Sequence, residues 1–426
     1  MEVNGWKLRS IGDFLTESRI PGRAGDEARK LTVRLYGKGV IAKRETWGSA
    51  ATKYYRRRSG QFIYSKLDAL NGAFGIVPES LDGFESTLDL PAFDFRGEVD
   101  PDWLLQSVSR PAFYGRFKFS AIGSRKANRV PVDEFLASKL LAPPVTEQRA
   151  IAQAIRTGID ALQAAQNSIT LLERAKRDAM RRLLTLGMKG DAAELTPLKE
   201  NWVLGRIAEG VEAIPKDWRL VQLTKYAKLE SGHTPSRNHP EYWEGDIPWV
   251  SLADTDRFDA PRLLDTTETI GDLGLKHSSA RLLPEGTVVF SRTATVGKAA
   301  ILGRPMATSQ DFADWVCGSK VSPRYLLQVF RHMSREWKRL QAGSTHQTIY
   351  MPTFKKLQIL LPPFDEQEAI ADVGEAFDQR IAAERTALDD LRASKDALAQ
   401  ELLSGRVRLP GATIRRLAST DHAEAS

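Results

Sequence analysis

The 426-residue sequence has one cysteine, Cys317, and no run of about 18 apolar residues. A single cysteine excludes a disulfide framework and any zinc site that needs paired cysteines. The six histidines show no His-Glu-x-x-His spacing, so no catalytic metal site is expected. Residues 1–10 lack the apolar core of a signal sequence. We therefore expect a soluble, cytoplasmic protein without a membrane segment.

Sequence motifs of common catalytic sites are also missing. There is no Gly-x-x-x-x-Gly-Lys-Ser/Thr phosphate loop and no Gly-x-Ser-x-Gly nucleophile turn. DNA amino-methyltransferases usually carry Asn/Asp-Pro-Pro-aromatic, but the run Leu361-Pro-Pro-Phe364 has leucine at the polar position. A leucine side chain cannot bind the amino group of a base. We expect that the chain is not an enzyme.

Positive charge is concentrated in two separate segments. Lys and Arg number 61 against 54 Asp and Glu, a net charge of +7. Residues 1–142 hold 23 basic and 17 acidic residues, and residues 214–361 hold 20 and 15. The segments 143–213 and 362–426 have net charges of +1 and −5. This distribution suggests two contact surfaces for a polyanion, although excesses of this size are common on soluble proteins.

The chain contains a long internal repeat. Residues 143–185 align without a gap to residues 362–404, and 12 of these 43 positions are identical, including Lys176 with Lys395. Weaker similarities precede the aligned stretch, and Trp6 and Trp218 each open one half. A repeat offset of 219 residues indicates a tandem duplication rather than a solenoid.

The repeated stretches predict two long helices. From Ile151 to Leu186, the apolar positions alternate in steps of four and three, the a/d pattern of a coiled coil, and the second copy follows the same pattern. Each helix should span about 40 residues and about 60 Å. We expect the two to pack antiparallel. Lys176 and Lys395 occupy matching seam positions, where they either snorkel at the edge or fix the register.

The predicted fold is α+β. Two similar α/β globular parts are separated by two long helices that form an antiparallel coiled coil with pseudo-twofold symmetry. The expected domains are a first globular domain 1–142, a central coiled-coil helix 143–190, a connector 191–213, a second globular domain 214–361, a C-terminal coiled-coil helix 362–409 and a partly disordered tail 410–426.

Several basic and polar runs are candidates for DNA contact. Arginine donates to phosphates or guanine, and tyrosine can bind phosphate or stack on a base. Solvated edge strands, ordinary basic turns and a buried Ser309–Gln310 pair are the alternatives. The candidates are Lys53, Tyr54, Tyr55, Arg56, Arg57, Arg58, Ser65, Lys66, Arg125, Lys126, Arg129, Ser291, Arg292, Thr293, Lys298, Gln310, Ser344, His346 and Gln347.

These residues resemble the specificity (S) subunit of type I restriction–modification enzymes. The pattern Leu/Ala-Pro-Pro-x-x-Glu-Gln-x-x-Ile, followed by a long helix ending near Leu-Leu-Ser-Gly-Arg406, is similar to that family's repeated regions. Ile214-Pro-x-x-Trp218, Ile247-Pro-Trp249 and the Gly343-Ser-Thr loop resemble its recognition domains. The resemblance covers nearly the whole chain and is weaker in residues 1–142.

The resemblance implies a DNA-specificity subunit that binds a bipartite target in double-stranded DNA. The helices would set the spacing and dock two methyltransferase subunits, with Glu147, Gln148, Lys176, Glu366, Gln367 and Lys395 at the subunit interface. Restriction motor-nuclease subunits would join the complex through the methyltransferase subunits. This chain would bind no cofactor or metal, whereas its partners would use S-adenosylmethionine, ATP and Mg²⁺. The alternative is a two-headed protein-binding adaptor without nucleic-acid recognition.

Overall fold

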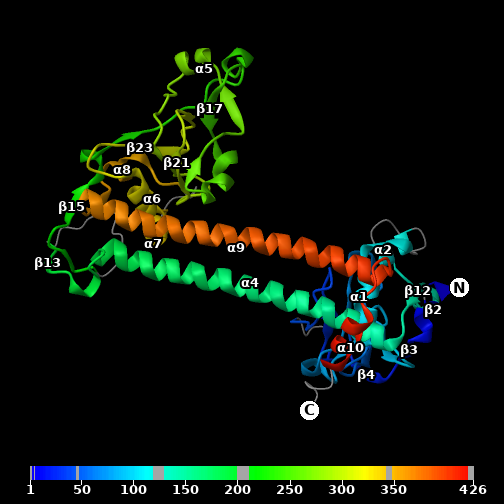
Figure 1. Cartoon of the computed structure of the whole chain (residues 1–426). Helices are drawn as coiled ribbons and strands as arrows, with labels where there is room; N and C mark the ends of the chain where they lie inside the picture. Colours follow the sequence, from blue (N-terminus) through cyan, green and yellow to red (C-terminus); the bar gives the residue numbers. More distant parts are fainter. Residues whose placement is uncertain are drawn as a thin grey trace. The chain divides into compact units, whose positions relative to one another are not determined.

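The computed structural model of the chain describes residues 2–3, 5–44, 48–118, 129–198, 211–341 and 348–420. The chain divides into unit 1, Met1–Ala164 with Leu388–Ser426, and unit 2, Ala165–Ala387. Two long helices, α4 (Val145–Leu186) and α9 (Phe364–Ser404), each contribute one end to each unit (Figure 1). The prediction of an α+β fold with two long helices is thereby confirmed.

Unit 1 is built on a four-stranded antiparallel sheet in the order β3-β11-β8-β9. Its strands are β1 (Glu2–Val3), β2 (Trp6–Ser10), β3 (Leu15–Ser18), β4 (Pro21–Ala24), β5 (Leu31–Val33), β6 (Val40–Ala42), β7 (Lys53–Arg56), β8 (Phe62–Tyr64), β9 (Phe74–Ile76), β10 (Glu85–Ser86), β11 (Ala92–Phe95) and β12 (Lys139–Ala142). Its short helices are α1 (Pro101–Val108), α2 (Pro111–Tyr114), η4 (Gly115–Lys118) and α3 (Val132–Ala137).

Unit 2 is built on a five-stranded sheet in the order β16-β23-β20-β21-β18. Its strands are β13 (Leu195–Pro197), β14 (Ala213–Pro215), β15 (Arg219–Gln222), β16 (Ala227–Glu230), β17 (Ile247–Val250), β18 (Arg262–Leu263), β19 (Glu268–Ile270), β20 (Val288–Ser291), β21 (Ala299–Leu302), β22 (Ala307–Thr308), β23 (Phe312–Cys317) and β24 (Gln358–Leu361). Its shorter helices are η7 (Pro240–Tyr242), η8 (Leu252–Asp259), α5 (Asp272–Lys276), α6 (Pro323–His332), α7 (Ser334–Gln341) and α8 (Met351–Lys355).

The two units repeat one topology. In unit 1, β2 pairs antiparallel with β12, and in unit 2, β15 pairs antiparallel with β24, in each case just before the prolines that precede a long helix. The antiparallel order β3-β11-β8-β9 corresponds to β16-β23-β20-β21. A proline-initiated helix, α1 or α6, then follows the last of these strands in the chain. The duplication inferred from the sequence therefore extends to the globular parts.

Within each unit, the ends of α4 and α9 pack antiparallel. In unit 1, a Cβ on Gly158 of α4 would lie 2.7 Å from Cγ of Lys395 on α9. In unit 2, Glu173 of α4 pairs with Arg385 of α9 at 2.8 Å. Apolar residues at both helix ends enter the cores: Ile151 and Leu402 in unit 1, and Met180 and Ile370 in unit 2. The apolar a/d residues at the ends of each long helix are therefore buried against the globular parts as well as against the other long helix.

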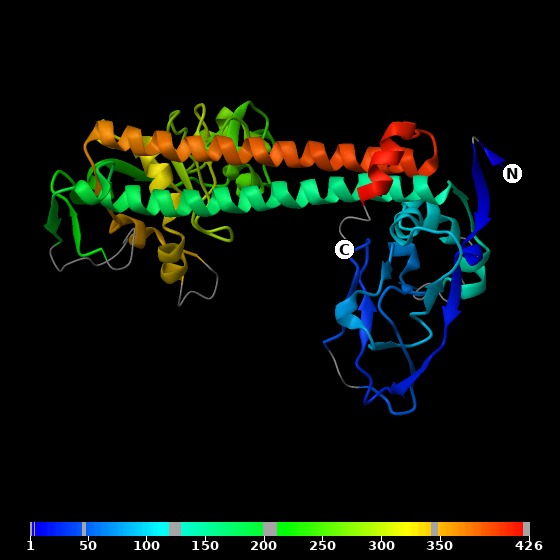
Figure 2. The same ribbon diagram turned by 60° about the horizontal axis from the view of Figure 1, so that its bottom comes forward.

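The segment after α9 forms a helix, α10 (Gly411–Thr420), where the sequence analysis expects a partly disordered tail. Leu409, just before it, packs on the core of unit 1. Figure 2 draws α10 in red near the first turns of α4. In the described part of the chain, no helix is long and apolar enough to cross a membrane.

Candidate nucleic-acid interface and helix junctions

In unit 1, Trp6 connects the start of α4 to the end of α9. The indole Nε1 of Trp6 donates to Oε2 of Glu147 at 3.3 Å, and Arg408 donates to both carboxylate oxygens of Glu147 at 2.6 Å. Gly405, which ends α9, has φ +75°, and a Cβ on it would lie 3.2 Å from the Trp6 ring. Glycine is favoured here because it adopts the left-handed conformation and permits close packing.

Unit 2 contains the same junction. Nε1 of Trp218 donates to Oε2 of Glu366 at 2.9 Å, and the backbone N–H of Met188 donates to Oε1 at 2.9 Å. Gly187, which follows α4, has φ +69°, and a Cβ on it would lie 3.0 Å from the Trp218 ring. In each unit, one tryptophan therefore contacts both long helices. Trp6 packs at the start of α4 and the end of α9, and Trp218 packs at the start of α9 and the end of α4.

The glutamine after each of these glutamates has an equally repeated role. Oε1 of Gln148 accepts the backbone N–H of Asp100 at 2.9 Å, and Oε1 of Gln367 accepts that of Ser322 at 2.9 Å. Asp100 and Ser322 are the N-caps of α1 and α6. Nε2 of each glutamine donates to the carbonyl of the residue five positions earlier, at 2.9 Å. These amides connect each long helix to the adjacent short helix.

These contacts correct the expected subunit interface. Glu147, Gln148 and Gln367 are at most 3% exposed, and the carboxylate of Glu366 is engaged inside its own unit. A partner cannot use side chains whose polar atoms are buried and already bonded. The sequence analysis missed this role, although the equal repetition of a tryptophan and a Glu-Gln pair was a signal for an internal junction.

The two seam lysines differ in their surroundings. Nζ of Lys176 lies 2.5 Å from Oδ1 of Asp378, and Arg331 of α6 approaches the other oxygen of Asp378 at 3.3 Å. Burial lowers the pKa of Lys176, and the bond to Asp378 opposes this shift. Lys395 instead packs over Gly158 and pairs with Asp396 at 2.5 Å. Lys176 is thus an internal ion-pair residue rather than an exposed docking residue.

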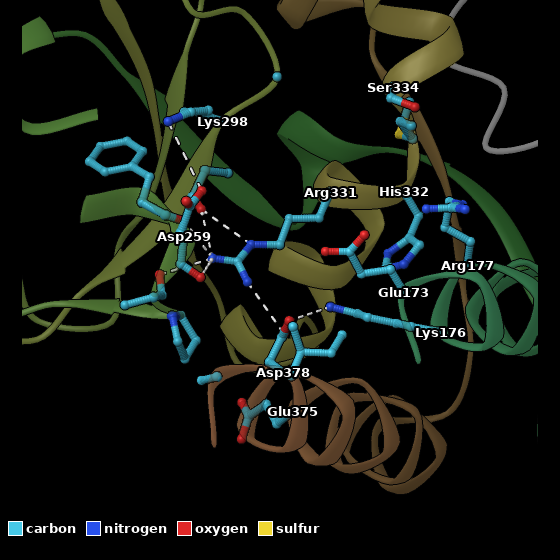
Figure 3. Close-up of a pocket in the computed structure, with 18 of the residues that line it drawn as sticks. Glu173, Lys176, Arg177, Asp259, Lys298, Arg331, His332, Ser334, Glu375 and Asp378 are labelled. Atoms are coloured by element: carbon cyan, nitrogen blue, oxygen red, sulfur yellow. Dashed lines mark hydrogen bonds and ion pairs between the residues drawn. The ribbon is translucent and has the colours of Figure 1, made fainter. Parts of the chain in front are cut away.

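A cleft of about 1070 Å³ in unit 2 lies beside this ion pair (Figure 3). Arg331 spans its floor, donating to the carbonyl of Phe258 at 2.7 Å and to that of Ala260 at 2.9 Å. His332 is mostly buried, and burial lowers its pKa to about 4. The imidazole is therefore neutral at pH 7 and adds no charge to the cleft, whose lining includes the Lys176–Asp378–Arg331 cluster among other charged residues.

The basic run on β7 divides into exposed and buried residues. Lys53, Arg56 and Arg58 are exposed, and Tyr54 and Tyr55 are half-buried. Arg57 is fully buried and bonds to the carbonyls of Ser18 and Leu90 at 2.9 and 3.1 Å and to Oγ of Ser86 at 2.7 Å. Burial lowers its pKa to about 10. Arg57 is therefore a structural residue, which corrects its assignment to DNA contact.

The other candidates in unit 1 are partly engaged. Ser65 is buried and donates to Asp68 at 2.9 Å, so its hydroxyl belongs to a turn. Lys66 is half-buried. Arg129 is exposed and pairs with Asp89 at 3.2 Å, a weak surface contact that a phosphate could displace.

In unit 2, the residues after β20 form a bonded turn. Ser291 is fully buried and lies 2.9 Å from Oγ1 of Thr295, so its assignment to DNA contact is also corrected. Arg292 donates to the carbonyl of Gln310 at 2.6 Å, and Thr293 donates to Asp311 at 2.8 Å.

Two further candidates in unit 2 remain at the surface. The side chain of Gln310 is exposed and accepts from Thr234 at 2.7 Å, so it is not the buried polar partner of Ser309. Lys298 donates to the carbonyl of Thr255 at 3.0 Å and lines the cleft.

Five candidates lie outside the described residues: Arg125, Lys126, Ser344, His346 and Gln347. The two segments that hold them occur at corresponding points of the repeat. Basic residues flank each segment, with Arg116 before and Arg129 after the first, and Lys338 before and Lys355 after the second. Among the residues that the structure describes, no group of three or more His, Cys, Asp or Glu could hold a metal ion.

Asp314 in the unit 2 sheet gives a pH-dependent prediction. Its side chain is fully buried, Oδ2 accepts from Thr308 at 2.6 Å, and Oδ1 has no partner among the described residues. Burial raises the pKa of Asp314 to about 8. The folded protein then binds a proton that the unfolded chain releases near pH 4, so this group lowers stability as the pH rises from about 4 to 8, by up to about 1.4 kcal/mol per pH unit.

We therefore expect Asp314→Asn to have a higher melting temperature than the wild type at pH 9 and a similar one at pH 5. Melting curves of both proteins at the two pH values test this. An equal difference at pH 5 and pH 9 would contradict a protonated Asp314.

Comparisons with known proteins agree with this architecture. A family model described as "Type I restriction modification DNA specificity domain" matches residues 215–393. The MjaIX specificity subunit of Methanocaldococcus jannaschii is 32% identical over 170 residues, 39% of each chain. The HindI specificity subunit of Haemophilus influenzae is 21% identical over 363 residues, 72% of this chain and 77% of that protein. The match to the first relative thus spans well under half of that protein's length.

Solved structures show the same fold. The HsdS subunit of Thermoanaerobacter tengcongensis superposes with a TM-score of 0.52 at 16% identity, covering 95% of this chain and 98% of that one. A chain from a study of the assembly and conformational transition of a type I R-M system superposes with a TM-score of 0.60 at 16% identity, covering 96% and 100%. The curated relatives are named specificity subunits, which agrees with the expectation that the chain is not an enzyme.

Proposed function

We propose that this chain is a specificity subunit of a type I restriction–modification system and that it binds a bipartite sequence in double-stranded DNA. The globular part of each unit reads one half-site. The observation that carries this proposal is the repetition of one strand order and one tryptophan–glutamate junction in two units that share a pair of helices. Two similar scaffolds with different surface residues are suited to recognising two different short sequences.

The proposed base-reading residues belong to two segments whose sequences differ between the units and which lie outside the described residues. They are Arg125 and Lys126 in the first segment, and Ser344, His346 and Gln347 in the second; with Gly123-Ser124 aligned to Gly343-Ser344, Lys126 corresponds to His346. Arginine, glutamine and histidine side chains can donate to base edges in the major groove. The basic residues that flank each loop would position it through phosphate contacts.

Methylation and cleavage are assigned to partners. The methyltransferase subunits, two in our proposal, would bind S-adenosylmethionine, and motor-nuclease subunits would use ATP and Mg²⁺. The Glu-Gln residues first expected at the subunit interface are not part of this proposal, because their polar atoms are engaged within their own units. The outward surfaces of α4 and α9 are therefore the proposed docking surface; among exposed apolar side chains there, Leu171 is 62% and Leu398 is 47% exposed.

The test is methylome sequencing of two cell populations that both contain the methyltransferase, one of which expresses this chain and one of which lacks it. We expect a split, asymmetric motif that is methylated only when the chain is present. The alternative function, a two-headed protein adaptor, predicts an unchanged methylation pattern and no retardation of any duplex by the purified chain. An unchanged pattern in cells that express the chain would overturn the proposal.

A further inference from the structure

The two units differ most in one region of the shared topology. In unit 1, residues 19–61 connect β3 to β8, and we call this segment the first insert. In unit 2, residues 231–287 connect β16 to β20, and we call this segment the second insert. The first insert contributes β4 and β7 to a small sheet of order β10-β7-β4 and also contains the β5–β6 hairpin. Figure 2 draws its strands in blue, on the side of unit 1 away from α4 and α9.

The first insert is strongly basic at its surface. Its described residues include ten exposed Lys or Arg side chains and two exposed acidic ones, Asp26 and Glu27. The exposed basic residues are Arg19, Arg23, Arg29, Arg34, Lys38, Lys43, Arg44, Lys53, Arg56 and Arg58. Ten against two gives a surface excess of eight positive charges within one segment.

Two buried cations lie within the first insert, and one buried carboxylate, Glu85 of the neighbouring β10, accepts from the backbone N–H groups of Arg23 and Arg29, so the buried charge beneath this surface is a net +1. Arg57 is fully buried, and Lys30 is 5% exposed with Nζ 5.6 Å from the centre of the Tyr54 ring. Water and salt screen buried charges less than surface charges. On the surface above them, Lys53, Arg56 and Arg58 form no ion pair with any residue that the structure describes. These three side chains are free to take phosphates as partners.

The second insert has the opposite charge. It exposes five basic side chains, Arg237, Arg257, Arg262, Lys276 and Arg281, and eight acidic ones. The exposed acidic residues are Glu241, Glu244, Asp246, Asp256, Asp259, Asp265, Asp272 and Glu285. Five against eight gives an excess of three negative charges at the surface.

Two glycines of the second insert pack closely against backbone next to acidic residues. A Cβ on Gly245 would lie 2.4 Å from Cα of Gly271, and a Cβ on Gly271 would lie 2.4 Å from the carbonyl oxygen of Glu244. This contact places the backbone of Glu244 to Asp246 beside Gly271, which Asp272 follows in the chain, and all three acidic side chains are exposed. Exposed carboxylates repel a phosphate backbone.

We propose that the first insert contacts the DNA phosphate backbone and that the second insert does not, so the two units bind their half-sites by different electrostatic means. In unit 2, positive charge lies after the insert instead, because residues 288–361 hold eleven Lys or Arg and three Asp or Glu. The inference rests on the proposed DNA-binding function and assigns one of its contact surfaces.

The experiment compares two triple variants of the full-length chain. The first is Lys53→Ala with Arg56→Ala and Arg58→Ala, which leaves the structural Arg57 intact. The matched control is Arg257→Ala with Arg262→Ala and Lys276→Ala, three exposed basic residues of the second insert. The affinity of each protein for a mixed-sequence duplex is measured between about 50 and 200 mM salt, where counterion release dominates.

Each phosphate contact adds about 0.9 to the slope of log affinity against log salt. We expect the first triple variant to lower the slope by about 2.7 and the affinity at physiological salt by on the order of 10- to 100-fold. The control variant should match the wild type, and the melting temperatures of all three proteins should agree. Equal slopes for the wild type and the first variant, or an equal loss in the control, would overturn the inference.

A failure of this inference can be told apart from a failure of the proposed function. If methylome sequencing finds the bipartite motif with the wild type but the first triple variant keeps the full salt slope, the function stands and the first insert is not the contact surface. If the wild type neither directs methylation to a split motif nor binds duplex DNA, the proposed function itself is wrong.

Discussion

We expect Asp378→Ala to destabilise unit 2 by about 3–5 kcal/mol, the usual cost of leaving a buried cation without its partner. The side chain of Asp378 is 19% exposed and receives both Lys176, 11% exposed, and Arg331, 14% exposed. Removal of the carboxylate leaves two largely buried positive charges close together. Arg331 keeps its bonds to backbone carbonyls, whereas Lys176 loses its ion pair.

Two further variants separate the charge effect from lost packing. The double variant Lys176→Met with Asp378→Leu should cost less than Asp378→Ala, because it also removes one of the two cations that lose the carboxylate, and the other, Arg331, keeps its bonds to backbone carbonyls. Asp390→Ala, an exposed carboxylate on α9, should have no measurable effect.

The readouts are thermal melting and amide hydrogen exchange in α6 and the first half of α9. Burial already lowers the pKa of Lys176, and loss of Asp378 lowers it further, so the defect of Asp378→Ala should shrink as the pH approaches 10. A double variant as unstable as Asp378→Ala would contradict the buried-charge explanation.

The helices were predictable because their signals are local. A heptad pattern of some 40 residues determines helical structure and partner packing together, and α4 and α9 lie within the predicted ranges 143–190 and 362–409. The ten residues of α10 lie in the tail 410–426, which was expected to be partly disordered and for which the sequence predicted no helix. That helix depends on tertiary packing near Leu409, which composition cannot indicate.

The candidate site was only partly predictable because burial depends on tertiary structure. Arg56, Arg57 and Arg58 look alike in the sequence. The side chain of Arg57, however, points into unit 1, where its guanidinium donates to the carbonyls of Ser18 and Leu90. Glu147 and Glu366 look like surface residues at a helix start, yet each meets an indole 141 or 148 residues away in the chain. Such pairings arise only from the folded topology.

The charge difference between the two inserts was also present in the sequence. The net charge of each whole globular part does not reveal it, because that charge is +6 for residues 1–142 and +5 for residues 214–361. The strand boundaries of the structure define the two inserts, and only then is it visible that the first insert has a positive net charge and the second a negative one.

We propose that the helix pair sets the spacing between two independently read half-sites. Three added heptads in each helix, inserted after Ala164 in α4 and after Ala387 in α9, keep the seam in phase. The 21 residues lengthen each helix by about 31 Å. At 3.4 Å per base pair, this corresponds to about nine base pairs, close to one turn of DNA.

The decisive measurement is selection of bound duplexes from a library of random sequence by the wild type and by this insertion variant, each with its methyltransferase subunits. We predict that both proteins select the same two half-site sequences and that the variant requires a spacer longer by about nine base pairs. An unchanged spacer, altered half-sites or a single continuous motif would contradict the account.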